Sequence, residues 1–206
     1  MVSDARGAAR RIYPSDSGVE SLTGQAQLTL FTSARRPLCK RFSVEAGKIK
    51  KQAVADLYDG TAKTVAAPTA ADLNALLDGL NHRQAVSAGI LEHGQRAKIT
   101  TAAKEGQSGG TSRSLRNFTF PAAPGWLLWD YDDKTMPGNV RARVEALGGP
   151  VRAFLRLWPE AKGAACVIRP SSSDGVSAPG AAEINSAGLH GFFLVNDVSR
   201  SREILE

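Results

Sequence analysis

The stretch from Gly125 to Asp133, which reads GWLLWDYDD, constrains the fold more than any other part of the chain. Its apolar run Trp126–Trp129 begins after Pro124 and Gly125 and is ended by charged residues. A short continuous apolar run with such boundaries is typical of a strand that is buried on both faces. We therefore expect a sheet in the protein core, with this strand inside it.

The patterns elsewhere predict helices and further strands. Leucines at positions 73, 76, 77 and 80 have the spacing of one helix face and follow Thr69, a residue type that caps helices, so we expect a helix from Thr69 to Leu80. A second helix is expected from Pro137 to Leu147, because a proline begins it and two glycines close it. Apolar runs predict strands at Ala164–Ile168 and Leu189–Val195. Together these elements indicate an α+β or α/β core.

The first part of the chain is expected to differ from the rest. Residues 1–25 show no sustained hydrophobic period, so we interpret them as a flexible leader. Two short β-like runs, Leu28–Phe31 and Lys40–Val44, are separated by a segment with Pro37, and we expect them to form a hairpin. A small polar stretch near residue 110 then divides a basic N-terminal subdomain, 26–110, from a core at 111–206.

Charge and cysteine usage narrow the class of protein. The net charge is +6, and the excess lies before Pro121, where 17 Lys and Arg face 10 Asp and Glu, against 9 and 10 afterwards. A basic part is consistent with an acidic partner. Cys39 and Cys166 allow no disulfide framework and no zinc site of four cysteines, which favours a reduced cytoplasm. No apolar stretch has the length of a membrane span, so we expect no membrane association.

Asp130 and Asp132 are the strongest candidates for site chemistry. Side chains two residues apart on a strand point to the same face, so the two carboxylates are expected to lie together, with Asp133 outside the pair. Adjacent carboxylates repel unless a cation lies between them, and Mg²⁺ or Mn²⁺ can meet that need while it binds substrate phosphates. A charged strand end without a metal is the alternative interpretation.

Two later segments could contact phosphate. Arg169 precedes Ser171, Ser172 and Ser173 in a loop after a predicted strand, and a guanidinium with several hydroxyls suits phosphate oxygens. A serine-rich surface loop without a ligand is equally compatible. His190 begins the strand Leu189–Val195 just after Gly188, where it could donate to a triphosphate oxygen or serve only as a structural residue.

The order of these motifs resembles the archaeo-eukaryotic primase superfamily, including primase-polymerases of plasmids, phages and mobile elements. A strand ending in Asp-x-Asp is followed by a strand that enters a serine-rich loop, and then by Gly188-Leu189-His190, where the family has Ser-x-His. The resemblance is closest at 118–132 and 169–195. It implies a primase-polymerase-like core with a mainly antiparallel sheet flanked by helices, preceded by the smaller basic part.

The resemblance also implies roles for residues. Asp130 and Asp132 would hold the catalytic Mg²⁺ or Mn²⁺, His190 would contact phosphate, and Arg169 and Ser171 to Ser173 would lie near the incoming nucleoside triphosphate. The family's third motif supplies another carboxylate from a later strand, and Asp197 follows His190 too closely for that role. We therefore expect a core that is truncated before this motif.

The function expected is that of a DNA primase or primase-polymerase in the replication of a mobile element. Its partners would be a single-stranded DNA template and nucleoside triphosphates, with a possible helicase, and Arg113 and Arg116 could track the template backbone or form only a solvated surface. An alternative is a catalytically dead nucleic-acid-binding remnant or regulator of the same fold. A glycosyltransferase that uses Asp-x-Asp for a nucleotide sugar would leave the serine loop and His190 unexplained.

Overall fold

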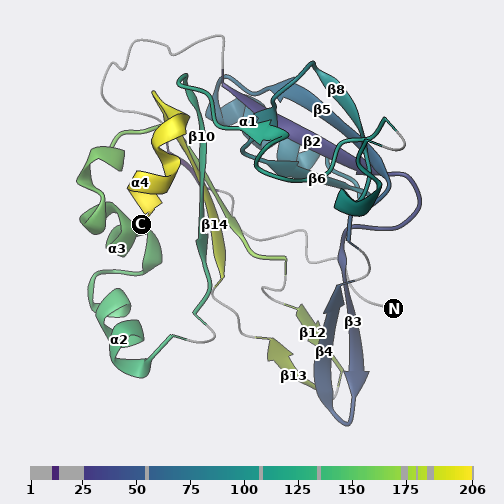
Figure 1. The fold of residues 1–206 in the computed structure, drawn as a ribbon. Coiled ribbons are helices and arrows are strands. Elements are labelled where there is room, and N and C mark those ends of the chain that lie inside the picture. Colours follow the sequence, from purple (N-terminus) through teal and green to yellow (C-terminus); the bar gives the residue numbers. More distant parts are fainter. Residues whose placement is uncertain are drawn as a thin grey trace. The chain divides into compact units, whose positions relative to one another are not determined.

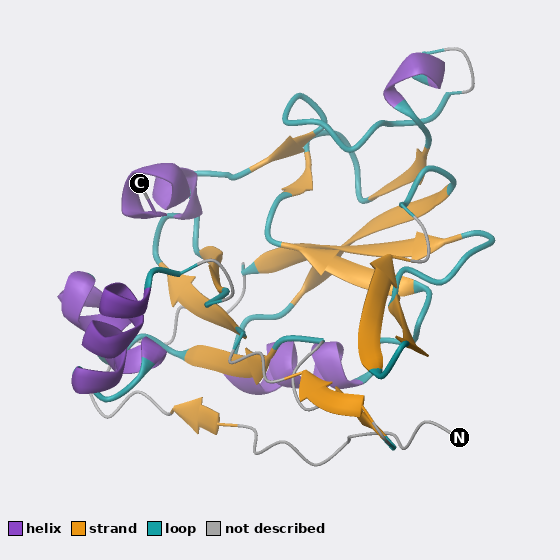
Figure 2. Cartoon of the chain, turned by 90° about the horizontal axis from the view of Figure 1, so that it is seen from below, coloured by secondary structure: helices purple, strands orange, loops and turns teal. Residues whose placement is uncertain are grey.

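The protein has an α+β fold with mainly antiparallel sheets (Figure 2). The computed structural model describes residues 11–13, 26–53, 56–106, 109–133, 136–172, 176–179, 181–184 and 188–205. Contacts divide the chain into two compact units. Unit 1 comprises Met1–Val19, Ser43–Lys50 and Leu128–Phe193, and unit 2 comprises Glu20–Phe42, Lys51–Leu127 and Leu194–Glu206. The boundary that we expected after residue 110 falls inside unit 2.

Unit 2 is built on a four-stranded antiparallel sheet with the order β6-β2-β5-β8 (Figure 1). Alternate residues of these strands face a core in which the rings of Phe31 and Phe118 lie 5.4 Å apart between their centroids. The other residues of the strands face the opposite side. The strands are β2 (Gln27–Ser33), β5 (Gly60–Ala66), β6 (Gln84–Ser87) and β8 (Arg96–Ile99).

The predicted helix after Thr69 is confirmed as α1 (Ala70–Asp78). Thr69 caps it: its hydroxyl accepts from the amide of Asp72, while the Asp72 carboxylate accepts from the amide of Thr69. This reciprocal pair satisfies two amides that a helix start leaves open. Leu73 is fully buried, so the leucine face covers apolar surface as its spacing predicts.

The expected hairpin between Leu28–Phe31 and Lys40–Val44 is wrong. The first run lies in β2, which pairs with β5 and β6, and the second lies in β3 (Lys40–Glu45), which pairs with β4 (Lys48–Ala53). Ala46 and Gly47 both have positive φ, at 51° and 71°, as a tight two-residue hairpin turn requires. A local turn after residue 45 therefore decides the partner of β3.

A second four-stranded sheet, with the order β1-β11-β14-β10, belongs mainly to unit 1, and its pairs β1–β11 and β11–β14 are antiparallel. The predicted strands and second helix are confirmed, with small differences in their bounds. The strands are β1 (Arg11–Tyr13), β10 (Gly125–Tyr131), β11 (Cys166–Pro170) and β14 (Leu189–Val195), and the helices are α2 (Gly138–Ala146) and α3 (Pro150–Leu157). The boundary between the two units falls within β10 and β14.

One face of this sheet packs against α3 through aromatic rings. Phe154 stacks on Trp129 with 4.6 Å between the ring centroids, and it also contacts Phe193 and Trp158. Gly191 makes room for this packing, because a Cβ there would lie 2.7 Å from Cε3 of Trp129. The absence of a side chain at Gly191 thus allows the indole to lie across β14.

Two sequence expectations differ from the structure in detail. Trp126 and Leu127 are buried, but Leu128 is 39% exposed, so β10 is not buried on both faces along its whole length. Leu128, like Asp130, lies on the face of the sheet opposite Trp129 and α3, where both are exposed. Within the expected leader, Arg11–Tyr13 form β1 and pair with β11. The rest of 1–25 lies outside the described residues.

Gly125 makes room for the Val198 side chain, because a Cβ on Gly125 would lie only 2.8 Å from the Val198 Cγ1 atom.

The remaining elements are short. None of the helices in the described ranges combines the length and apolar character needed to cross a membrane. The short elements are β7 (Ile90–Leu91), β9 (Phe118–Thr119), β12 (Val176–Ala178), β13 (Ala181–Ile184), α4 (Ser201–Leu205) and the 3₁₀ turns η1 (Ala102–Lys104), η2 (Pro159–Ala161) and η3 (Val198–Arg200).

Candidate functional site on the sheet of unit 1

The face of the unit 1 sheet opposite α3 carries the polar residues singled out from the sequence. Trp129 faces α3, and strand alternation then turns Asp130 to the other face. Asp132 follows the end of β10 and, like Asp130, is exposed. Exposed and partly buried residues alternate from Leu128 to Tyr131, which is the pattern expected if Asp130 and Asp132 share one exposed face.

His190 meets this face from the neighbouring strand. Its Nε2 atom lies 3.4 Å from Oδ1 of Asp130, and the imidazole and carboxylate side chains are 39% and 67% exposed. Both groups are therefore accessible to a ligand from solvent. An imidazole beside a carboxylate can donate a hydrogen bond to it and can present its ring edge to an anionic substrate.

Arg169 lies on the next strand along. In the β11–β14 ladder Arg169 is paired with His190, and residues directly opposite on antiparallel strands point to the same face. Three adjacent strands thus bring a carboxylate, an imidazole and a guanidinium onto one surface, in the order Asp130, His190, Arg169. The Nε atom of Arg169 is buried, so its stem is enclosed by the protein.

Ser171 and Gly188 meet at the end of the same ladder. The amide of Ser171 donates to the carbonyl of Gly188 at 2.7 Å. A Cβ on Gly188 would lie 2.9 Å from the Ser171 Oγ atom and 3.1 Å from its Cβ. The hydroxyl of Ser171 therefore occupies the space that a side chain at position 188 would take, two residues before His190. Ser172 is exposed, and Ser173 lies outside the described residues.

Asp133 is held apart from this cluster by α2. Its Oδ2 atom lies 3.8 Å from Nε of Arg141, and the Arg141 guanidinium donates to the Asp133 carbonyl at 2.9 Å. Burial raises the pKa of the neighbouring Tyr131, and the negative charge of Asp133 adds to that increase. Asp133 thus anchors the chain between β10 and α2.

The structure gives Asp197 a local role. Its carboxylate accepts from the amide and the hydroxyl of Ser199, at 3.0 and 2.6 Å, and so caps η3. Across the part of the chain that the structure describes, no group of three or more His, Cys, Asp or Glu side chains could hold a metal ion. A metal at Asp130 and Asp132 would therefore need ligands from the substrate or water.

The two arginines proposed for nucleic-acid contact lie in different settings in unit 2. Arg113 is exposed. Arg116 forms an ion pair with Glu105, which also accepts from Ser112 and Asn117. These hydrogen bonds, led by that of Ser112, lower the pKa of Glu105 to about 2. Arg116 therefore has an internal partner, and its role toward nucleic acid stays a prediction.

Sequence reasoning missed a group of cations on the unit 2 sheet. Lys63, Arg96 and Lys98 are all exposed and lie on neighbouring strands. The available signal was period-two spacing within the strands, where Arg96 and Lys98 flank one small residue. That spacing shows a shared face but not the pairing of Lys63 with Arg96, which comes only from the fold.

Comparison with known proteins adds no assignment: no family model, curated protein or solved structure matches the chain. The resemblance of the motifs to primases stays a prediction. The functional argument rests on the geometry of Asp130, His190 and Arg169.

Proposed function

We propose that the chain is the primase or primase-polymerase domain of a mobile element and performs metal-dependent, template-directed nucleotidyl transfer in the cytoplasm. The observation that carries this proposal is the approach of His190 to Asp130, at 3.4 Å, on a face shared with Arg169. Residues 60 positions apart thereby form one exposed polar surface. Both side chains are open to solvent, so a ligand can reach them.

The donor set at β10 fits a divalent cation. Mg²⁺ is commonly held by one or two carboxylates, with waters and substrate phosphates completing its shell, and Asp130 and Asp132 supply that number. Bound Mg²⁺ or Mn²⁺ would neutralise phosphate charge and activate the attacking 3′-hydroxyl. The second carboxylate is necessary in this scheme because the described residues offer no larger ligand group.

The other residues act on the triphosphate. His190 Nε2, which now faces Asp130, would donate to a phosphate oxygen. Arg169 offers a planar fork of donors that matches two oxygens at once, and its buried Nε indicates a fixed stem. Ser171 would add a hydroxyl at the end of the ladder. These groups would orient the nucleotide for in-line displacement, and charge stabilisation of this kind accounts for most of phosphoryl-transfer catalysis.

Primer extension tests the proposal. Purified chain, a primed single-stranded template, nucleoside triphosphates and Mn²⁺ should yield extended product. Asp130→Asn should abolish extension, and His190→Gln should lower kcat by about 100-fold, the usual scale for one stabilising donor. Asp133→Asn is the matched control, since this carboxylate pairs with Arg141 and should leave kcat within a few fold. No extension with either metal, or equal activity in Asp130→Asn, would reject the proposal.

A non-catalytic nucleic-acid-binding regulator of the same fold is the second candidate. The observation that favours it is that no group of three or more His, Cys, Asp or Glu side chains among the described residues could hold a metal ion. This candidate predicts salt-sensitive binding of single-stranded DNA together with no nucleotide incorporation. Calorimetric titration with Mn²⁺ gives an independent measure. If the chain is a regulator without a metal site, the unmodified chain and Asp130→Asn should give the same heat of Mn²⁺ binding.

A further inference from the structure

The open face of the unit 2 sheet gathers positive charge. Lys63 on β5 is directly opposite Arg96 on β8, and Thr61 is directly opposite Lys98. All four side chains are exposed. Like charges placed directly opposite on a sheet repel each other, so the Lys63–Arg96 pair costs stability when no anion is present. A sheet face that carries such a pair is suited to an anionic ligand.

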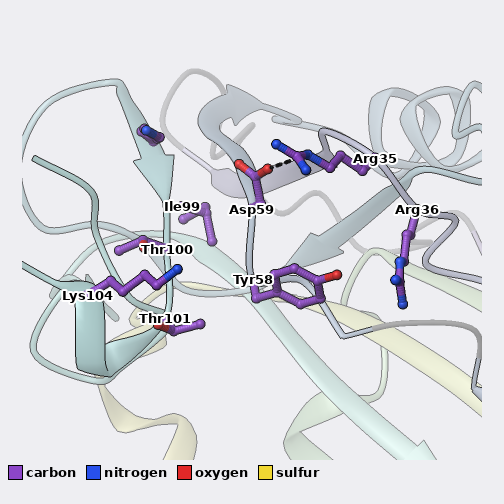
Figure 3. Close-up of a pocket in the computed structure, with 9 residues that line it drawn as sticks. Arg35, Arg36, Tyr58, Asp59, Ile99, Thr100, Thr101 and Lys104 are labelled. Atoms are coloured by element: carbon purple, nitrogen blue, oxygen red, sulfur yellow. Dashed lines mark ion pairs between the residues drawn. The ribbon is translucent and has the colours of Figure 1, made fainter. Parts of the chain in front are cut away.

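Two hollows adjoin on unit 2 and share Lys98. One, of about 430 Å³, lies over the sheet and includes Lys63, Arg96 and Thr32 in its lining. The other, of about 390 Å³, is lined by residues that follow β2, precede β5, or lie at the end of β8 and just after it (Figure 3). Its lining includes Arg35, Arg36, Tyr58, Asp59, Lys98 and Lys104. Lys98 belongs to the lining of both, and we call the two hollows together the basic groove.

The charge of the basic groove is almost entirely of one sign. Asp59 is the only acidic residue in the lining of either hollow, and its carboxylate is engaged by Arg35 at 3.2 Å, which Figure 3 shows as a dashed line. In the described part of the chain, Lys63, Arg96 and Lys98 form no ion pair. These three cations therefore have no acidic partner among the described residues, and hydroxyls of Thr32 and Thr61 lie near them.

We propose that the basic groove binds the sugar-phosphate backbone of a single-stranded nucleic acid. Arg96 and Lys98 are two residues apart on one strand, so their Cα atoms lie roughly 6.8 Å apart along it, and a row of such cations suits a row of phosphates. Tyr58 lines the same groove and is 43% exposed, which leaves its ring open to a base. A charged groove with an aromatic ring is the usual means of binding a single strand.

The shape of the groove favours a single strand over other phosphate ligands. A mononucleotide would engage only one of the two hollows, whereas the cations run through both. A duplex keeps its bases stacked inside and gives Tyr58 no base to contact. The site lies wholly in unit 2 and does not rest on transfer chemistry at Asp130, so binding and primer extension can succeed or fail separately.

Fluorescence anisotropy with a labelled 12-nucleotide single strand tests the groove. The full chain with Lys63→Gln, Arg96→Gln and Lys98→Gln should bind at least about tenfold more weakly at 50 mM salt than the unmodified chain. The slope of log K against log salt should fall in magnitude by about 2, because each phosphate contact contributes about 0.7. The matched control is Arg41→Gln, Lys48→Gln and Lys50→Gln, which removes three exposed charges from the β3–β4 hairpin.

The control variant distinguishes binding at the basic groove from a general electrostatic attraction between the protein and the nucleic acid. Equal weakening in both triple variants would overturn the proposal, as would tighter binding of a blunt duplex than of the single strand. Tyr58→Ala should weaken the single strand several-fold while it leaves the salt slope unchanged, because stacking releases no counterions. Matching circular dichroism spectra and melting curves ensure that each variant is folded. DNA and RNA strands of one sequence then show whether the sugar matters.

Discussion

The two units use the same kind of scaffold for different chemistry. Each presents one face of an antiparallel sheet, but the unit 1 face pairs opposite characters, with Asp130 against His190, whereas the unit 2 face sets Lys63 beside Arg96. The first arrangement places an imidazole beside a carboxylate, and these groups can move a proton or orient a phosphate. In the second arrangement, the two like charges repel each other when no anion is bound. We infer that strand register, more than strand composition, decides what a sheet face can bind.

The cores beneath the two faces also differ, and this gives the largest expected effect. Phe154 in unit 1 contacts three other aromatic rings, while Phe118 in unit 2 has one ring partner, Phe31. Phe154→Ala should lower the free energy of unfolding by about 4–5 kcal/mol and Phe118→Ala by about 3 kcal/mol, since a large cavity replaces each ring. Chemical denaturation measures both changes.

Leu157→Ala is the control for this comparison. Leu157 ends the same helix as Phe154 but is 86% exposed, so its removal should change the free energy of unfolding by less than about 0.5 kcal/mol. If Leu157→Ala and Phe154→Ala cost the same, the aromatic packing against β10 and β14 is not what stabilises unit 1. If Phe118→Ala costs more than Phe154→Ala, the ranking of the two cores is reversed.

The contact between Gly188 and Ser171 gives the next effect in size. Gly188→Ser places a Cβ 2.9 Å from the Ser171 Oγ atom, and we expect a loss of about 1–2 kcal/mol from overpacking. Ser171→Gly removes the Ser171 hydroxyl and Cβ, which are the atoms that the new Cβ at position 188 would contact. The double variant should therefore recover at least half of the Gly188→Ser loss in a thermodynamic cycle measured by urea unfolding. Strict additivity of the two changes would mean that these positions do not compete for space.

How far the sequence predicts the structure depends on whether the signal is local. Helix α1 and strand β14 were predictable, since Thr69 with Asp72 encodes a cap and the run Leu189–Val195 is continuous. The partners of β2 were not, because β5 and β6 come from later in the chain and nothing in residues 27–33 identifies them. Local preference favoured a hairpin with Lys40–Val44, and the Ala46-Gly47 turn overrode it.

The candidate sites follow the same rule. Asp130 and Asp132 were identifiable because two residues on one strand share a face by alternation alone. The approach of His190 to Asp130 could be expected only from the resemblance to primases, since no local pattern joins residues 60 positions apart. Neither strand alternation nor the resemblance to primases predicted the basic groove. Lys63 lies 33 positions before Arg96, and only the β5–β8 register makes them neighbours.

The smallest effect concerns acid sensitivity of unit 2. Hydrogen bonds from Ser112, Arg116 and Asn117 lower the pKa of Glu105 from 4.5 to about 2. Because the folded-state value lies below the unfolded one, the ionised carboxylate contributes stability above pH 4.5, and this contribution is lost as the pH falls toward 2. Glu105 follows Lys104, which lines the basic groove, so the same network holds one wall of that groove.

Glu105→Gln tests this contribution. The variant should be less stable than the unmodified chain at pH 6, and the difference in melting temperature should shrink as the pH falls from 4.5 toward 2, because the Glu105 carboxylate takes up its proton over this range. Solvent screening keeps the effect below those of Phe154→Ala and Gly188→Ser. A melting difference that stays constant from pH 6 to pH 2 would show that the carboxylate charge is not what holds this loop.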